Sequence, residues 1–144
     1  MDNAGLMIVR RAQVGEIAAC AALYERVLRA TFTWIPAEQH QAADFIAAAQ
    51  DEEVYLAVDG ERLLGVASLY RPDSFLHSLY VEGRGLGVGK ALLDHVADEA
   101  DGPLHLKCQL PNTRAQAFYV REGFRAVEEG RDPGASIGWV RLSR

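Results

Sequence analysis

The glycine-rich connection near the middle of the chain limits the possible folds more than any other segment. Glycines occupy every second position inside the run Arg84-Gly85-Leu86-Gly87-Val88-Gly89-Lys90. The apolar run 75–81 before it is typical of a strand, and the run 91–97 after it is typical of a helix. Glycines let the backbone approach a ligand closely, and the first turn of a helix offers free N–H groups and the positive end of a dipole. The order strand, glycines, helix therefore predicts an anion site, with a phosphate-bearing ligand as the first candidate.

Two other phosphate-binding motifs fail on their spacing. A P-loop needs Gly six residues before its Lys and Ser or Thr directly after it, but Arg84 and Ala91 stand at those places around Lys90. A dinucleotide-binding GxGxxG motif needs a small residue five positions after its first glycine, and no start in this segment provides one. The pattern Arg-x-x-Gly-x-Gly remains. The alternative interpretation is a flexible connector that binds no ligand.

The composition indicates one globular domain, which we expect to span residues 1–144. Apolar residues make up 49% of the chain and charged residues 24%, which is ordinary for such a domain. The net charge of −5 argues against nucleic-acid binding. No apolar run reaches the ~20 residues of a membrane span, and no signal-peptide pattern is present, so we expect no membrane partner. Two distant cysteines, Cys20 and Cys108, form no disulfide framework, so we expect a reduced, cytoplasmic protein.

The apolar pattern predicts alternating elements along the whole chain. We expect strands near residues 6–10, 54–58, 63–70, 75–81, 104–109, 124–128 and 137–142, and helices near 14–31, 37–50, 88–100 and 112–122. Asp59-Gly60 signals a hairpin turn, and Asn112 is a good N-cap. This order predicts an α/β fold with a mixed central β-sheet and helices on both faces. The strands at 75–81 and 104–109, joined by a helix, should be parallel.

Two segments together resemble the GNAT superfamily of acyl-CoA-dependent N-acyltransferases. Residues 84–89 resemble the pyrophosphate loop of that family, Arg/Gln-x-x-Gly-x-Gly/Ala. The run Asn112-Thr113-Arg114-Ala115-Gln116-Ala117-Phe118-Tyr119, followed by Glu122-Gly123-Phe124, resembles its second motif, Asn-x-x-Ala-x-x-Phe-Tyr and Gly-Phe. The resemblance implies a single-domain GNAT-like fold. It also implies transfer of an acetyl group from acetyl-CoA to a primary amine, by direct attack in a ternary complex and without a metal. A catalytically inactive acyl-CoA-binding sensor module is the alternative.

The resemblance also implies where acetyl-CoA binds. Its pyrophosphate would lie on the amides of the glycine loop, and its pantetheine arm would follow the strand at 75–81. The residues expected to bind it are Leu79, Tyr80, Val81, Arg84, Gly85, Leu86, Gly87, Val88, Gly89, Lys90, Asn112 and Phe118. Lys90 either adds positive charge for the phosphates or is a solvated lysine. Asn112 caps its helix, contacts the coenzyme arm, or does both.

Acetyl transfer to an amine benefits from a base and an acid. A lysine-like amine with a pKa near 10.4 costs roughly 4.6 kcal/mol to deprotonate at pH 7, and a leaving thiolate gains from a proton donor. The resemblance makes Tyr119, at the motif's tyrosine, the expected acid, with packing as the alternative. His77, on the strand expected to line the acetyl site, is the expected base. Its alternative role is that of a core histidine.

The acceptor site is the least specified part of the prediction. Phe32, Trp34 and Asp44 fall where related proteins build the acceptor pocket, although core packing explains the aromatics equally well. Asp44 would then hold a cationic amine. The acceptor is expected to be a small-molecule or peptide amine, and a homodimer is left open. Cys108 is expected to be a buried strand thiol and not a nucleophile.

Overall fold

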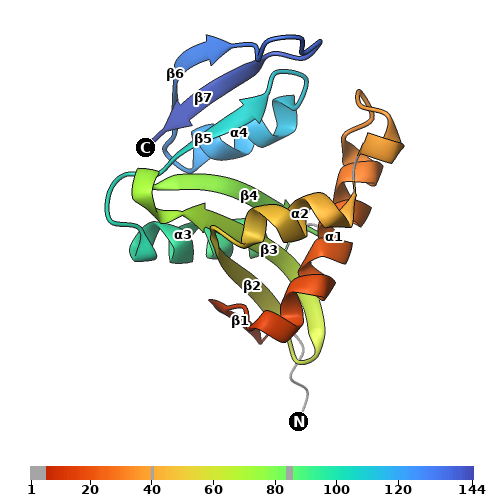
Figure 1. Cartoon of the computed structure of the whole chain (residues 1–144). Helices are drawn as coiled ribbons and strands as arrows, with labels where there is room; N and C mark the ends of the chain where they lie inside the picture. The colour runs from red at the N-terminus through yellow and green to blue at the C-terminus, as the bar shows by residue number, and fades with distance from the viewer. Residues whose placement is uncertain (1–5, 40, 84–85) are drawn as a thin grey trace.

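A computed structural model describes residues 6–39, 41–83 and 86–144 and shows a mixed sheet with helices on both faces (Figure 1). The strands are β1 Met7–Arg11, β2 Glu53–Asp59, β3 Arg62–Tyr70, β4 Phe75–Val81, β5 His105–Gln109, β6 Arg125–Gly130 and β7 Trp139–Ser143. The helices are α1 Ile17–Thr31, α2 Ala42–Ala49, α3 Val88–Glu99 and α4 Thr113–Arg121, with short 3-10 turns at Val14–Glu16, Ala37–Gln39 and Arg71–Asp73. The predicted fold class and element order are confirmed.

The sheet has the strand order β1-β2-β3-β4-β5-β7-β6. The first four strands are antiparallel neighbours, and the predicted turn at Asp59-Gly60 joins β2 to β3 with Gly60 at φ +62°. A positive φ is a conformation that glycine adopts without a steric cost. The last strand of the chain, β7, lies between β5 and β6, so that β6 and not β7 forms the second edge of the sheet. The predicted parallel pairing of β4 with β5 is confirmed.

Each face of the sheet carries its own apolar core. On one face, α1 and α2 bury Cys20, Ala21, Leu23 and Phe45 against Val54, Leu56 and Val66 of the sheet. On the other face, α3 and α4 bury Val88, Leu92, Leu93, Val96 and Tyr119 against residues of β2 to β5 and β7. The central strands are covered on both sides, which explains why residues 64–69 of β3 are all buried. No helix in the described ranges is long and apolar enough to cross a membrane.

Two irregularities separate β4 from its neighbours. Strands β4 and β5 pair only at Phe75 and His105, and Figure 1 shows the two strands running into different halves of the molecule beyond that point. The register between β3 and β4 also shifts, so that Ser68 pairs with Ser78 and Leu69 pairs with Leu76. His77 is therefore the extra residue of a β-bulge, a feature that redirects side chains and frees backbone groups from the ladder.

A partly buried carboxylate outside the cleft makes the stability depend on pH. Glu53 accepts hydrogen bonds from Arg71 (Oε2–Nε 2.5 Å and Oε1–Nη2 2.8 Å) and from the Tyr55 hydroxyl (2.8 Å). The Arg71 guanidinium is the main cause that lowers the pKa of Glu53 from 4.5 to about 2. Because the folded pKa lies below the unfolded one, this stabilisation is complete above about pH 4.5 and is lost as the pH falls toward 2.

We therefore expect Glu53→Gln to lower the free energy of unfolding by roughly 1.5–3 kcal/mol at neutral pH, the range for hydrogen bonds to charged groups. Denaturant unfolding at several pH values measures the difference between this variant and the wild type. The difference should shrink as the pH falls below about 4.5. If the two proteins differ in the free energy of unfolding by the same amount at pH 7 and near pH 2, the low pKa is wrongly assigned to Glu53.

Candidate functional site

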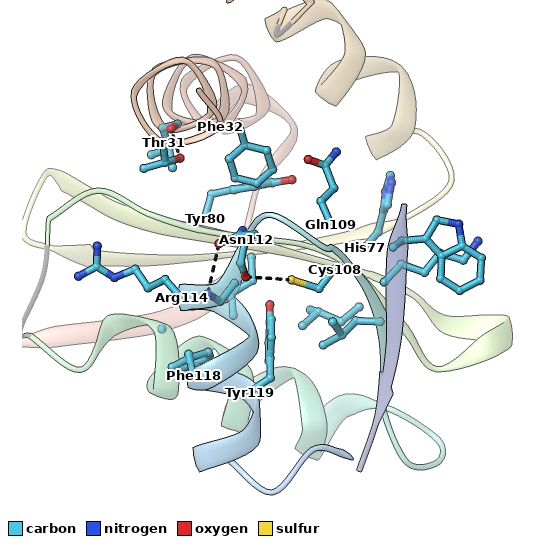
Figure 2. A pocket seen from close by; sticks show the side chains of 18 of the residues that line it. Thr31, Phe32, His77, Tyr80, Cys108, Gln109, Asn112, Arg114, Phe118 and Tyr119 are labelled. Carbon is cyan, nitrogen blue, oxygen red and sulfur yellow. Dashed lines mark hydrogen bonds between the residues drawn. The ribbon is translucent and has the colours of Figure 1, made fainter. Parts of the chain in front are cut away.

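A cleft of about 1250 Å³ opens where β4 and β5 diverge. Residues of β4, β5, α4, the first turn of α3, the end of α1 and the β6–β7 connection line it (Figure 2). Thirteen of the predicted site residues line this cleft: Phe32, His77, Leu79, Tyr80, Val81, Leu86, Gly87, Val88, Gly89, Lys90, Asn112, Phe118 and Tyr119. Arg84 and Gly85, which were also predicted, lie outside the described residues. The fold thus brings β4, the described part of the glycine loop and the second motif on α4 to one cleft.

The N-terminus of α3 presents backbone amides to the cleft without a side-chain cap. Gly87 is the N-cap residue, with φ +72° and ψ 16°, and as a glycine it has no side chain that could accept a hydrogen bond from the first turn. No described atom lies within 4 Å of the position that a Cβ would take at Gly87, whereas a Cβ at Gly89 would meet the Phe118 ring at 3.4 Å. Free N–H groups, a positive dipole end and open space are the properties of an anion site.

Lys90 and two arginines of α4 are the positive side chains described near this end. Lys90 does not stand free, because its Nζ lies 2.9 Å from Glu122 and 3.4 Å from Asp94. The hydrogen bond that Lys90 donates to Glu122 is the first cause that raises the pKa of Lys90. Arg114 and Arg121 also line the cleft, are exposed and form no ion pair within the described part of the chain. Their spacing of seven residues places them on one face of α4. That spacing could have identified them in the sequence, where we did not single them out.

Tyr119 both packs and reaches the cleft. It is 8% exposed, and its ring contacts Phe118 and Phe124 edge-on, with centroid distances of 5.2 and 5.4 Å. Figure 2 shows its hydroxyl directed into the cleft on the side of Cys108. Burial is the main cause that raises the pKa of Tyr119 far above its ordinary value, followed by the neighbouring Cys108 and Tyr80. The hydroxyl therefore stays protonated and remains a hydrogen-bond donor at neutral pH.

Asn112 and Cys108 have structural roles beside the cleft. The Asn112 side chain accepts a hydrogen bond from the Ala115 amide at 3.2 Å, so the predicted N-cap of α4 is confirmed. The Cys108 thiol is free and buried, as predicted, and its Sγ lies 3.8 Å from the Asn112 carbonyl oxygen. Burial raises the pKa of Cys108 to about 11. A thiol in this state is not a nucleophile at neutral pH, because the thiolate is the reactive form.

His77 is not a core histidine. Its side chain is 47% exposed and lines the cleft, and its Nδ1 lies 2.6 Å from Oε2 of Glu52. The hydrogen bond to Glu52 is the first cause that raises the pKa of His77, and burial opposes it. Glu52 lies just before β2 and was not singled out in the sequence, because nothing in its local pattern indicates a partner 25 residues further along the chain.

Of the predicted acceptor residues, Phe32 and Trp34 stack on each other, whereas Asp44 lies outside the cleft. Phe32 lines the cleft, stacks on Trp34 at a centroid distance of 4.9 Å and faces Tyr80 at 6.3 Å. Trp34 donates a hydrogen bond from Nε1 to Oε1 of Gln109 at 2.5 Å, which ties the segment after α1 to the end of β5. Asp44 lies exposed in the first turn of α2 and does not line the cleft. Gln109, which lines the cleft, was not anticipated.

The comparison with known families matches this arrangement. The sequence profile of the acetyltransferase (GNAT) family aligns with residues 20–124. The chain belongs to the acetyltransferase (GNAT) family. The matched region contains β4, the glycine loop and α4, which together carry most of the predicted site. A search of curated protein sequences finds no match to this GNAT-family chain.

Solved structures share the fold of this GNAT-family protein at low sequence identity. The apo form of YjaB from Escherichia coli is 22% identical, with a TM-score of 0.77, and the match covers 95% of this chain and 96% of that one. A GCN5-related N-acetyltransferase from Rhodopseudomonas palustris is 20% identical, with a TM-score of 0.79 over 95% and 94% of the two chains. YncA from Salmonella typhimurium, a putative acetyltransferase solved with acetyl-CoA, is 19% identical, with a TM-score of 0.70 over 96% and 92%. These similarities establish the GNAT fold.

Proposed function

We propose that this GNAT-family protein transfers an acetyl group from acetyl-CoA to a primary amine by direct attack in a ternary complex. One observation carries the proposal: a single cleft is lined by the uncapped N-terminus of α3 and by His77 and Tyr119. The helix N-terminus suits a pyrophosphate, whereas an imidazole and a phenol suit proton transfer. Figure 2 shows Arg114 and His77 on opposite sides of Asn112, so a long ligand has distinct sites for its charged and reactive ends.

The described residues fit coenzyme A along this cleft. The amides of Gly87, Val88 and Gly89 would hold the pyrophosphate, together with Arg84 and Gly85, and the exposed guanidinium groups of α4 would add positive charge. Beyond Phe75, β4 has no hydrogen-bonding partner in β5, so its backbone groups toward Leu79 and Val81 are available to a ligand. Acetyl-CoA supplies an acetyl group activated as a thioester, and the side chains of this chain supply orientation and proton transfer.

The acceptor amine would enter from the side of Phe32 and Trp34. His77 would take a proton from the ammonium group, and the neutral amine would attack the acetyl carbon. Tyr119 would donate a hydrogen bond to the departing sulfur, because its raised pKa keeps the hydroxyl protonated. The high pKa of Cys108 supports direct attack over an acyl-cysteine route. Asp44 would contact only an acceptor that extends beyond the cleft. The two free, buried cysteines suit a reducing, cytoplasmic compartment.

Release of free thiol tests this function directly. We expect the protein to release coenzyme A from acetyl-CoA when it is given the right amine among polyamines, amino acids, aminoglycosides and peptide N-termini. Initial-rate patterns that intersect when both substrates are varied would support the ternary complex. A protein that binds acetyl-CoA, as seen by thermal melting, but releases no thiol above the background with any of these amines would favour the sensor alternative.

A further inference from the structure

We propose that Glu52 is a positioning residue that holds His77 in the orientation and tautomer needed for its action as the base. The inference rests on the proposed function, since it assigns a role within the same cleft. Glu52 would not touch the acceptor or acetyl-CoA. Its effect would pass through the 2.6 Å contact between its Oε2 and the Nδ1 of His77.

The chemistry of this contact determines which nitrogen of His77 is available. An ionised carboxylate only accepts hydrogen bonds, so the hydrogen of the neutral imidazole must lie on Nδ1. The lone pair then lies on Nε2, at the opposite side of the ring. The exposure of the two side chains agrees with this division, because Glu52 is 9% exposed and His77 is 47% exposed. The less exposed Glu52 would orient the imidazole ring, and the more exposed His77 faces the cleft.

The position of Glu52 is unfavourable for stability by itself. Its backbone amide donates to the Ala49 carbonyl at 3.3 Å, so Glu52 follows directly after the carboxyl end of α2. A negative charge near this end of a helix is destabilised by the dipole, and a nearly buried carboxylate also loses hydration. His77 is the ion-pair partner of Glu52 within the described ranges, and the bulge at His77 brings the ring to it. An arrangement that opposes local preferences is typical of a functional site.

Every proton in the transfer reaction then has a donor and an acceptor. The acceptor ammonium gives one proton to Nε2 of His77, and Glu52 stabilises the resulting imidazolium without accepting the proton. The nitrogen lone pair forms the C–N bond to the acetyl carbon, and the C–S bond breaks with its electron pair on sulfur. Tyr119 passes its hydroxyl proton to sulfur as it receives one from the new amide nitrogen. His77 finally releases its proton to water, so that one amide, one thiol and one proton result.

Several other titratable groups share the cleft with His77. They are Tyr80 on β4, Lys90 on α3, Lys107 and Cys108 on β5, Arg114, Tyr119 and Arg121 on α4, and Asp132 between β6 and β7. The interactions that raise the pKa of His77 both come from Glu52. Removal of the Glu52 charge should therefore lower the pKa of His77, and the other groups of the cleft should not counteract that change.

The pH dependence of kcat/KM separates a positioning role from a structural one. Because only neutral His77 accepts a proton, the rate should rise with pH through the raised pKa of His77. We expect Glu52→Gln to move this rise to lower pH and to lower the plateau roughly tenfold. The matched control is Glu53→Gln, because the next carboxylate pairs with Arg71 instead. That variant should lose stability and keep the wild-type pH profile. Glu52→Asp, which retains the charge, should keep the rise near its wild-type pH.

Further measurements complete the test. His77→Gln should lose rate most at neutral pH and recover toward the pKa of the amine, where the acceptor deprotonates unaided. Nitrogen-15 NMR titration of the His77 ring, assigned with this variant, should show the Nδ1–H tautomer and a higher pKa in the wild type than in Glu52→Gln. An unchanged pH dependence of kcat/KM in Glu52→Gln, or an unchanged pKa of His77 by NMR, would overturn the inference. If no amine gives thiol release, the proposed function fails, and the NMR titration still decides whether Glu52 controls His77.

Discussion

Gly87→Asp is expected to abolish the increase in melting temperature that acetyl-CoA gives the wild-type protein. A ligand that binds only the folded state stabilises it by about 2.7 kcal/mol at a concentration of 100 Kd, so the wild-type increase should be plain. Gly87 is the N-cap residue of α3, and its Cβ position faces open space. An introduced carboxylate would accept hydrogen bonds from the first-turn amides and repel a pyrophosphate at the same place.

Gly60→Asp is the matched control for this experiment. Gly60 also has a positive φ, +62° compared with +72° at Gly87, and its Cβ position is equally open. It lies in the β2–β3 hairpin and does not line the cleft. Both substitutions should therefore strain the backbone and lower the melting temperature without ligand. Only Gly87→Asp should lose the response to acetyl-CoA. A folded Gly87→Asp protein with the wild-type response would remove the phosphate from the N-terminus of α3.

Tyr119→Phe is expected to lower kcat by about 10²-fold while the fold and the binding of acetyl-CoA are retained. The phenylalanine ring keeps the edge-on contacts with Phe118 and Phe124, so the packing of α4 should change little. Only the hydroxyl that would protonate the departing sulfur is lost. Steady-state kinetics with the amine found in the screen measures kcat, and thermal melting with acetyl-CoA measures binding.

Tyr55→Phe is the matched control, because it removes a tyrosine hydroxyl that lies away from the cleft. Tyr55 is buried on the same face of the sheet, but its hydroxyl donates to Glu53 at 2.8 Å and it does not line the cleft. This variant should be less stable than the wild type and should keep its kcat. Wild-type turnover in Tyr119→Phe would reduce Tyr119 to a packing residue and leave water as the donor to sulfur.

Local signals predicted most of the secondary structure. Strand β4 has the predicted bounds, α3 begins at Val88 as predicted, and the cap of α4 forms at Asn112. The predicted helix at 37–50 is shorter, because α2 begins at Ala42, whose amide donates to the Glu25 carboxylate at 2.6 Å. Glu25 belongs to α1, and no pattern within residues 37–50 could indicate that contact.

The sequence by itself determined the family, the order of elements and the residues of the two motifs, because periodicity, glycines and caps act over a few neighbouring positions. Only the tertiary structure decided that β7 pairs with β5, that β4 and β5 diverge, and that a bulge turns His77 toward Glu52. These features depend on strand register and on contacts between distant segments. Register responds to the packing of both sheet faces, and a slip of one residue reverses every side chain. The cleft and the pairing of His77 therefore follow from how the whole sheet packs.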